Sequence, residues 1–182
     1  MKIGVLADTH VPDVLPALPE RVFDVFAGVD IILHAGDITD LAILQQLEPI
    51  AQTFAVFGDQ DSPEVKRYVE EKSRLEFANR AVGLVHGHRA LETTGVFKRM
   101  LYRVNRARQM DDLYGKVLRE FADVSVDAIV FGHSHQPYIK MHGGVLLFNP
   151  GSVARPSEPN SRGTVGMLEI SAYAIKGRII SL

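Results

Sequence analysis

The stretch Met1–His10, MKIGVLADTH, decides the fold. Ile3–Ala7 is a nearly continuous run of small apolar residues, which is typical of a β-strand buried on both faces. Side chains alternate along an extended backbone, so Asp8 and His10 point to the same side just past the strand. A carboxylate and an imidazole so placed suit a metal of the zinc, manganese or iron class. For this pair alone, a helix-capping Asp beside a surface His explains the pattern equally well.

The same pattern, an apolar strand followed by an acid or a histidine, recurs four more times. The residues at the five strand ends are Asp8, His10, Asp37, Asp59, His86, His133 and His135. Each one alone could be a capping Asp or a buried structural His, but the set would then require five independent coincidences. Three carboxylates and four imidazoles suffice for two divalent metals that share a carboxylate. They exceed the four ligands of a tetrahedral zinc and hold too many nitrogens for magnesium.

The order of the elements predicts an α/β protein with two sheets. In the first 70 or so residues, strands at 3–7, 30–34 and 53–57 alternate with helices at about 18–28, 41–47 and from 62 onward. Three strand–helix units of this kind predict a parallel sheet whose site lies at the carboxyl ends of the strands. In the second half we expect antiparallel strands and two helices, so the two sheets pack face to face with helices outside. The expected strands are 74–79, 81–86, 127–131, 138–142, 145–148, 164–170 and 172–180, and the helices are 94–107 and 111–122.

Composition narrows the class of protein. A chain of 182 residues is long enough for one domain with a substantial core. The net charge of −2 gives no global basic field for nucleic acid, and the absence of cysteine excludes disulfides and thiolate ligands. We see no signal peptide and no apolar run near the roughly 20 residues that cross a bilayer, so we expect a cytoplasmic protein with no membrane partner.

Five motifs in order resemble those of a known family. They are Asp-x-His at 8–10, Gly-Asp-x-x-Asp at 36–40, Gly-Asp-x-Asp at 58–61, His-Gly-His at 86–88 and Gly-His-x-His at 132–135. Together they are similar to the motifs of the calcineurin-like metallophosphoesterases, especially the small single-domain bacterial and archaeal phosphodiesterases. The resemblance implies one domain over residues 1–182. It also implies a four-layer α/β/β/α sandwich of two mixed β-sheets flanked by helices.

The resemblance also implies a site with two divalent metal ions, manganese being the one we favour and nickel, iron or zinc the alternatives. One metal would be bound by Asp8, His10, Asp37 and His135, and the other by Asp37, Asp59, His86 and His133. A hydroxide shared by the two metals would attack the phosphorus of a small-molecule phosphate ester, with a nucleotide-like substrate included. Two residues are candidates for protonating the leaving group, Asp61 and His88. For Asp61 the alternative is a helix N-cap, because Pro63 follows closely.

Two features depart from the family pattern. Asp59 stands where the family usually has Asn, which adds a negative charge to the site. A basic helical segment at about 94–108 lengthens the chain between His86 and His133. Its Lys and Arg face either helps attract an anionic substrate or is a solvated face over an apolar seam, and that seam could form a homo-oligomer.

The turn at 149–152, with Arg155, is either simple turn chemistry or part of the rim of the site, and we favour the turn. For the whole protein, the alternative to an enzyme is a non-catalytic scaffold. The eukaryotic retromer subunit is one, with this fold and a degraded metal site. Intact histidines at 86, 133 and 135 favour the enzyme.

Overall fold

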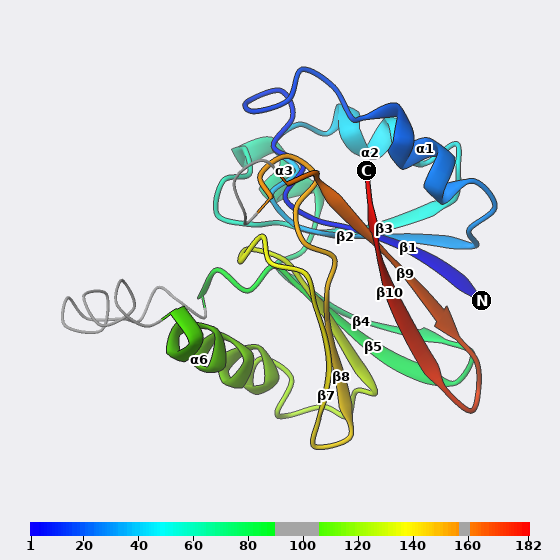
Figure 1. Ribbon diagram of the computed structural model, residues 1–182, viewed down its shortest axis with the longest axis vertical. Helices are drawn as coiled ribbons and strands as arrows, with labels where there is room; N and C mark the ends of the chain where they lie inside the picture. Colours follow the sequence, from blue (N-terminus) through cyan, green and yellow to red (C-terminus); the bar gives the residue numbers. More distant parts are fainter. Residues whose placement is uncertain (90–105, 157–160) are drawn as a thin grey trace.

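The protein is built in four layers. The computed structural model describes residues 1–89, 106–156 and 161–182. Two five-stranded sheets pack face to face, and helices cover their outer faces (Figure 1). The predicted α/β/β/α sandwich is therefore confirmed. Most of the basic segment expected at 94–108 lies outside the described residues.

The first sheet combines both ends of the chain. Its strand order is β10-β9-β1-β2-β3. β1 (Lys2–Leu6), β2 (Ile31–Ala35) and β3 (Gln52–Val56) run parallel, as their short apolar sequences predict. β9 (Thr164–Ile170) pairs antiparallel with β1, and β10 (Ile175–Ser181) pairs antiparallel with β9. The three parallel strands consequently end at one edge of the sheet.

The second sheet has the order β4-β5-β6-β8-β7, and its centre is parallel. β5 (Arg80–Val85), β6 (Ala128–Phe131) and β8 (Val145–Asn149) run in the same direction. β4 (Lys72–Phe77) and β7 (Tyr138–His142) pair antiparallel at the two edges. The expectation of an antiparallel second half was wrong for the centre, because α6 returns the chain from β5 to β6 in the same direction. Hairpin pairing is confined to the edges.

Of the helices in the described part of the chain, α6 is the longest. α1 (Glu20–Phe26), α2 (Ala42–Leu47) and α3 (Pro63–Tyr68) lie on the first sheet, and α6 (Arg106–Arg119) covers the second (Figure 1). The break predicted between helices 94–107 and 111–122 was wrong, because α6 runs through residues 108–110. No helix among the described residues is both long enough and apolar enough to span a membrane.

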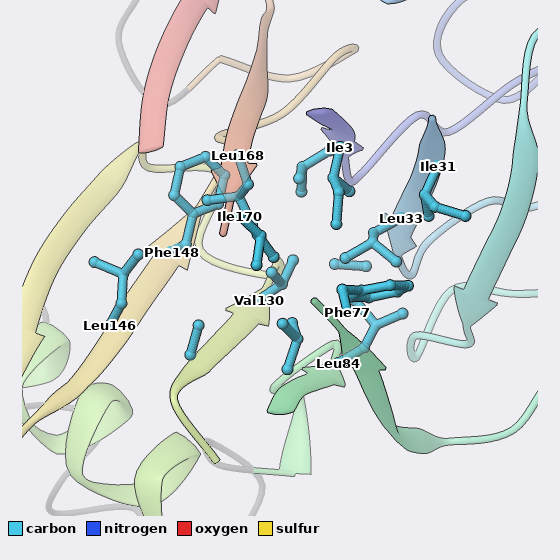
Figure 2. Close-up of a cluster of buried hydrophobic side chains, with 14 of the residues drawn as sticks. Ile3, Ile31, Leu33, Phe77, Leu84, Val130, Leu146, Phe148, Leu168 and Ile170 are labelled. Carbon is cyan, nitrogen blue, oxygen red and sulfur yellow. The ribbon is translucent and has the colours of Figure 1, made fainter. Parts of the chain in front are cut away.

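The main core lies between the two sheets, where apolar side chains from both inner faces meet (Figure 2). Phe148 of β8 is fully buried there. Its ring lies against two glycines of the opposite sheet, because a Cβ added at Gly166 would come within 2.4 Å of the ring and one at Gly177 within 2.6 Å. A flat aromatic ring over bare backbone thus sets how closely the two sheets approach.

This packing predicts a steric penalty at Gly166. Gly166→Ala should lower the free energy of unfolding by about 1–3 kcal/mol, since the added methyl overlaps the buried ring of Phe148. Gly115→Ala in α6 is the matched control, because its nearest neighbour is the far end of Arg119 at 3.7 Å. That change should stabilise the protein by about 0.5–1 kcal/mol through helix propensity. Urea unfolding of both variants checks the prediction, and equal effects would contradict it.

Candidate metal centre

All seven residues predicted for the metal site come together at one rim of the sandwich. They follow β1, β2 and β3 of the first sheet and β5 and β6 of the second. Three overlapping groups have ligand atoms within 4.8 Å of one another. These groups are Asp8, His10 and His135; Asp8, Asp37 and His86; and Asp59, His86 and His133. The residues that follow these strands therefore lie close together, and both sheets contribute to the cluster.

The first group is centred on one oxygen of Asp8. Asp8 Oδ1 lies 3.3 Å from His135 Nε2 and 4.0 Å from His10 Nε2. The other oxygen, Oδ2, accepts a hydrogen bond of 3.2 Å from the backbone N–H of His133. This bond fixes the carboxylate so that Oδ1 faces the two imidazoles. Burial lowers the pKa of His10, despite the nearby carboxylates of Asp8 and Asp37, so its ring is neutral and able to bind a cation.

Asp37 lies between the first group and the group of Asp59, His86 and His133. Its Oδ1 accepts a hydrogen bond of 2.9 Å from the backbone N–H of Gln60. Its Oδ2 lies 3.7 Å from His10 Nε2 and 3.3 Å from His86 Nε2. Burial raises the pKa of Asp37, but the adjacent ring of His86 outweighs burial and the net pKa is lowered. One anionic oxygen thus faces a histidine of each group.

The group of Asp59, His86 and His133 is centred on Asp59 Oδ1. This oxygen lies 3.3 Å from both His86 Nε2 and His133 Nδ1. The adjacent rings of His133, and then of His86, hold the pKa of Asp59 well below its usual value. His86 Nδ1 is 2.7 Å from the carbonyl oxygen of Ala35 and donates to it, so that Nε2 is aimed at the carboxylates. Burial lowers the pKa of His86, but the carboxylates of Asp37 and Asp59 beside its ring outweigh burial and raise it well above 6.5.

Buried polar atoms without partners show that this cluster suits cations. Within the described residues, four such atoms point into the space between the groups: Asp8 Oδ1, His10 Nε2, Asp37 Oδ2 and His86 Nε2. An unsatisfied buried polar atom costs about 1–3 kcal/mol, more if it is charged. Bound cations would satisfy the carboxylate oxygens and the imidazole nitrogens together, and would displace the proton that the carboxylates favour on His86. The mixture of nitrogen and oxygen donors fits a first-row transition metal or zinc.

The backbone at the site is strained. Six residues without the freedom of glycine have positive φ in the left-handed region: Asp8 (53°), His10 (44°), Asp37 (54°), Thr39 (70°), His133 (65°) and His135 (56°). Each such residue costs on the order of 1–3 kcal/mol, and strain of this kind collects at functional sites. Two backbone hydrogen bonds tie the first two loops together, from Asp8 N to Gly36 O and from His10 N to Asp37 O.

Glycines beside the strand ends make the close approach possible. A Cβ at Gly36 would lie 2.6 Å from His86 Nδ1, and one at Gly58 would lie 2.2 Å from Asp37 Oδ1. Gly36 has a positive φ of 90°, which glycine adopts without strain. The larger reason is space, because the two sheets bring ligand side chains directly against these backbones.

Asp61 is buried, with 5% of its surface exposed, and both of its oxygens accept backbone hydrogen bonds. Oδ2 accepts from Asp37 N at 3.0 Å and Gly58 N at 2.6 Å, and Oδ1 accepts from Thr39 N at 2.6 Å. Burial raises its pKa, against the effect of these donors. The N-cap alternative for Asp61 was wrong, because Ser62 accepts from Val65 N at the start of α3. Asp61 instead joins the turns that carry Asp37 and Asp59.

His88 lies beside the cluster, on the far side of His86. The two ring centroids are 5.6 Å apart, and the ring of Phe57 lies 6.4 Å from that of His88. His88 Nε2 is 3.8 Å from Glu71, which also pairs with Arg89. With 9% of its surface exposed, His88 is more buried than Asp59, His133 and His135 of the cluster.

His34 and Thr9 are two residues that sequence reasoning missed. Thr9 Oγ1 lies 3.1 Å from His34 Nε2 and donates to the carbonyl oxygens of Asp37 and Ile38. The His34 ring therefore donates through Nε2 to Thr9, and its buried Nδ1 has no hydrogen-bond partner. These hydrogen bonds lie beneath the cluster and link the loops after β1 and β2. The available signal was a histidine inside the apolar run of β2, which the search at strand ends passed over.

The turn at 149–152 braces the site, so the two alternatives for it were not exclusive. Asn149 Nδ2 donates to Gly132 O at 2.8 Å and lies 3.1 Å from Ser134 Oγ, within the loop that carries His133 and His135. Ser152 Oγ donates to Asp8 O at 3.0 Å and accepts from Arg155 N. Arg155 lies close enough for its charge to lower the pKa of His10, an effect smaller than that of burial.

Comparison with known proteins agrees with this geometry. The family model for the calcineurin-like phosphoesterase superfamily domain matches residues 1–173. The chain belongs to that superfamily, whose members use divalent metals to hydrolyse phosphate esters.

Two related sequences and one solved structure resemble this chain. A protein of Methanothermobacter thermautotrophicus, named a probable metallophosphoesterase, is 35% identical over 185 residues, which cover 99% of this chain and 92% of the relative. The phosphodiesterase MJ0936 of Methanocaldococcus jannaschii is 23% identical over 165 residues and covers 83% of each chain. The solved structure of Vps29 from Chaetomium thermophilum has a TM-score of 0.73 at 15% identity, covering 100% of this chain and 97% of that one. The last likeness shows the fold alone.

The buried His34 predicts sensitivity to acid. Burial, with a smaller effect of the charge on His86, lowers its pKa from 6.5 to about 3. Between these values the unfolded chain binds the proton and the folded chain does not, so stability falls as the pH falls, by about 1.4 kcal/mol per pH unit. His34→Gln should remove this contribution, and from pH 6.5 to 5 wild type should lose about 2 kcal/mol more than the variant. His142→Gln on β7 is the control, and urea unfolding of metal-free protein measures the slopes. Equal slopes for wild type and His34→Gln would contradict the prediction.

Proposed function

We propose that this protein is a dinuclear metal-dependent phosphoesterase that hydrolyses phosphate diesters in preference to monoesters. The observation that carries the proposal is Asp37 Oδ2, an unpartnered buried oxygen facing a histidine of each group. A carboxylate in that position can bridge two cations. Membership of the superfamily supports ester hydrolysis, and the relative named a phosphodiesterase supports the preference for diesters.

In this proposal each metal has four protein ligands. One is bound by Asp8, His10, Asp37 and His135, and the other by Asp37, Asp59, His86 and His133. Bound cations would lower the pKa of a shared water, making it a nucleophile, and would withdraw negative charge from the phosphate oxygens. Manganese is the metal we favour for this mixed donor set, with nickel, iron and zinc as alternatives.

The chain's own contribution is to hold the ligand atoms before the metals arrive. Backbone N–H groups of His133 and Gln60 each occupy one oxygen of Asp8 and Asp37, so the other oxygen faces the site. The Ala35 carbonyl does the same for His86 by taking the proton of Nδ1. Partners of this kind raise metal affinity because they orient the ligands and fix their protonation states.

The two candidates for proton donation differ in their surroundings. Both oxygens of Asp61 are occupied by backbone donors, so we propose that it positions the turns that carry Asp37 and Asp59. His88 stays the candidate for protonating the leaving group. Its ring lies beside that of His86, and the Glu71 carboxylate lies 3.8 Å from its Nε2.

The second candidate function is a non-catalytic scaffold on the same fold. This chain shares that fold with Vps29. Four unpartnered ligand atoms buried in one place favour the enzyme. A scaffold would gain nothing from the loss of stability that these unsatisfied atoms cause.

Metal content and turnover together test the proposal. Protein loaded with Mn²⁺ should bind two metals per chain and hydrolyse bis-p-nitrophenyl phosphate. Asp37→Ala should lose both metals, and Asp8→Ala should mainly lose one. Asp24→Ala, at an exposed position on α1, is the control and should lose neither. Wild-type metal content in Asp37→Ala would refute the shared ligand, and two bound metals without turnover of any ester would support the scaffold.

Asp59 gives a sharper prediction, because its carboxylate is 38% exposed and faces the space where an anionic substrate would bind. Asp59→Asn should loosen one metal modestly, since an amide oxygen is a weaker ligand than a carboxylate. At saturating Mn²⁺ it should raise kcat/KM several-fold, because it removes a negative charge that repels the phosphate. It should also shift the activity profile towards lower pH. A rate that falls despite excess metal, with an unchanged profile, would contradict the charge argument.

A further inference from the structure

A cavity of about 370 Å³ opens beside the metal centre, and His135 belongs to both. His135 Nε2 faces Asp8 Oδ1 at 3.3 Å, while the residue also lines the cavity. The other lining residues come from the loop after β6, the loop before β9 and the end of β10. A group attached to a phosphate at the metal centre could therefore extend into this space.

The wall of this cavity has several polar side chains, and its permanent charge is positive. Among the described residues that line it, Arg162 is the one permanent charge, and no carboxylate is present. Arg162 is exposed, and the described part of the chain offers it no ion pair. Two other cavities are different, because one includes Glu169 and the other Glu120 and Asp123 alongside their basic residues. The charge of Arg162 is therefore available to an anionic ligand.

An unsatisfied acceptor lies in the same wall. The side-chain oxygen Oε1 of Gln136 is buried and has no hydrogen-bond partner within the described residues. The backbone of Gln136 is held by Ser134 Oγ at 3.3 Å, so the side chain starts from a fixed point. A buried acceptor of this kind is satisfied when a ligand brings a hydroxyl or N–H donor. Hydroxyl-bearing Ser181 and Thr164 line the same space.

The cavity is joined rigidly to the metal centre. Thr164 Oγ1 packs so closely on Gly151 that a Cβ there would lie 2.0 Å from it, and Thr164 N donates to Ser152 O. Ser152 in turn donates to the carbonyl of Asp8. A ligand in the cavity and a phosphate at the metals would thus be held by one connected piece of backbone.

We propose that this cavity is a specificity subsite for a phosphorylated sugar, such as the nucleoside phosphate arm of a phosphodiester. Arg162 binds the second phosphate, and Gln136 Oε1 accepts a hydrogen bond from a sugar hydroxyl. The inference rests on the proposed phosphodiesterase function for its catalytic consequence, but the binding itself can be measured without turnover. The expected substrates are diesters with an additional phosphate on one arm.

Two substrates that differ by one phosphate test the subsite. Thymidine 5′-(p-nitrophenyl phosphate) and its 3′-phosphorylated counterpart share the scissile bond and the leaving group. Wild-type protein should prefer the 3′-phosphorylated ester by about tenfold in kcat/KM, the value of one charge-assisted hydrogen bond. Arg162→Gln should abolish this preference and leave hydrolysis of bis-p-nitrophenyl phosphate within about twofold. Arg178→Gln, an equal change of charge at an exposed position of β10, should keep the preference.

A binding measurement separates failure of the subsite from failure of the proposed function. Thymidine 3′,5′-bisphosphate should bind wild type about tenfold more tightly than Arg162→Gln by calorimetry, with and without Mn²⁺. Gln136→Glu, which keeps the acceptor and adds a negative charge, should also weaken the bisphosphate. If the binding difference is present but no ester is hydrolysed, the subsite stands and the phosphodiesterase proposal fails. If esters are hydrolysed without a preference, or if Arg162→Gln binds as wild type does, the subsite is refuted.

Discussion

The contact between Asp37 and His86 is the constraint on which the rest of the site depends. Asp37 follows β2 of the first sheet and His86 follows β5 of the second, and their facing atoms are 3.3 Å apart. The contact forms only because the parallel strands at the centre of both sheets end at the same rim. The apolar core between the sheets sets their separation, and Phe148 packs directly on Gly166 within it. Packing in the core thus determines the geometry of polar atoms at the edge.

The site is held in an unfavourable state by bonds that surround it. Six residues in the left-handed region and four unpartnered buried atoms all oppose folding. Against them act the three backbone bonds to Asp61, the link from His34 through Thr9, and the bonds of Asn149 and Ser152. These partners are all buried, and none needs to touch a substrate. Their hydrogen bonds stabilise the ligand residues in one arrangement before any metal binds.

The sequence predicted the cluster better than it predicted the topology. Asp8, Asp37 and His86 were found because a polar residue after a buried strand is a local pattern. The parallel centre of the second sheet was missed, because the direction of β6 depends on the long connection through α6. His34 was missed for a different reason. Its neighbours come from elsewhere in the chain, and a histidine in an apolar run gives no sign of them.

The second sheet is one uninterrupted insertion in the chain of the first, since β4 to β8 lie between β3 and β9. During synthesis from the N-terminus, the second sheet can therefore pair all of its strands while the first still lacks β9 and β10. The carbonyls of Ala7 and Asp8 find Val153 N, Ala154 N and Ser152 Oγ only at that late stage. A nascent chain would hold an open first sheet, with one edge of β1 unpaired, until nearly all of the protein has left the ribosome.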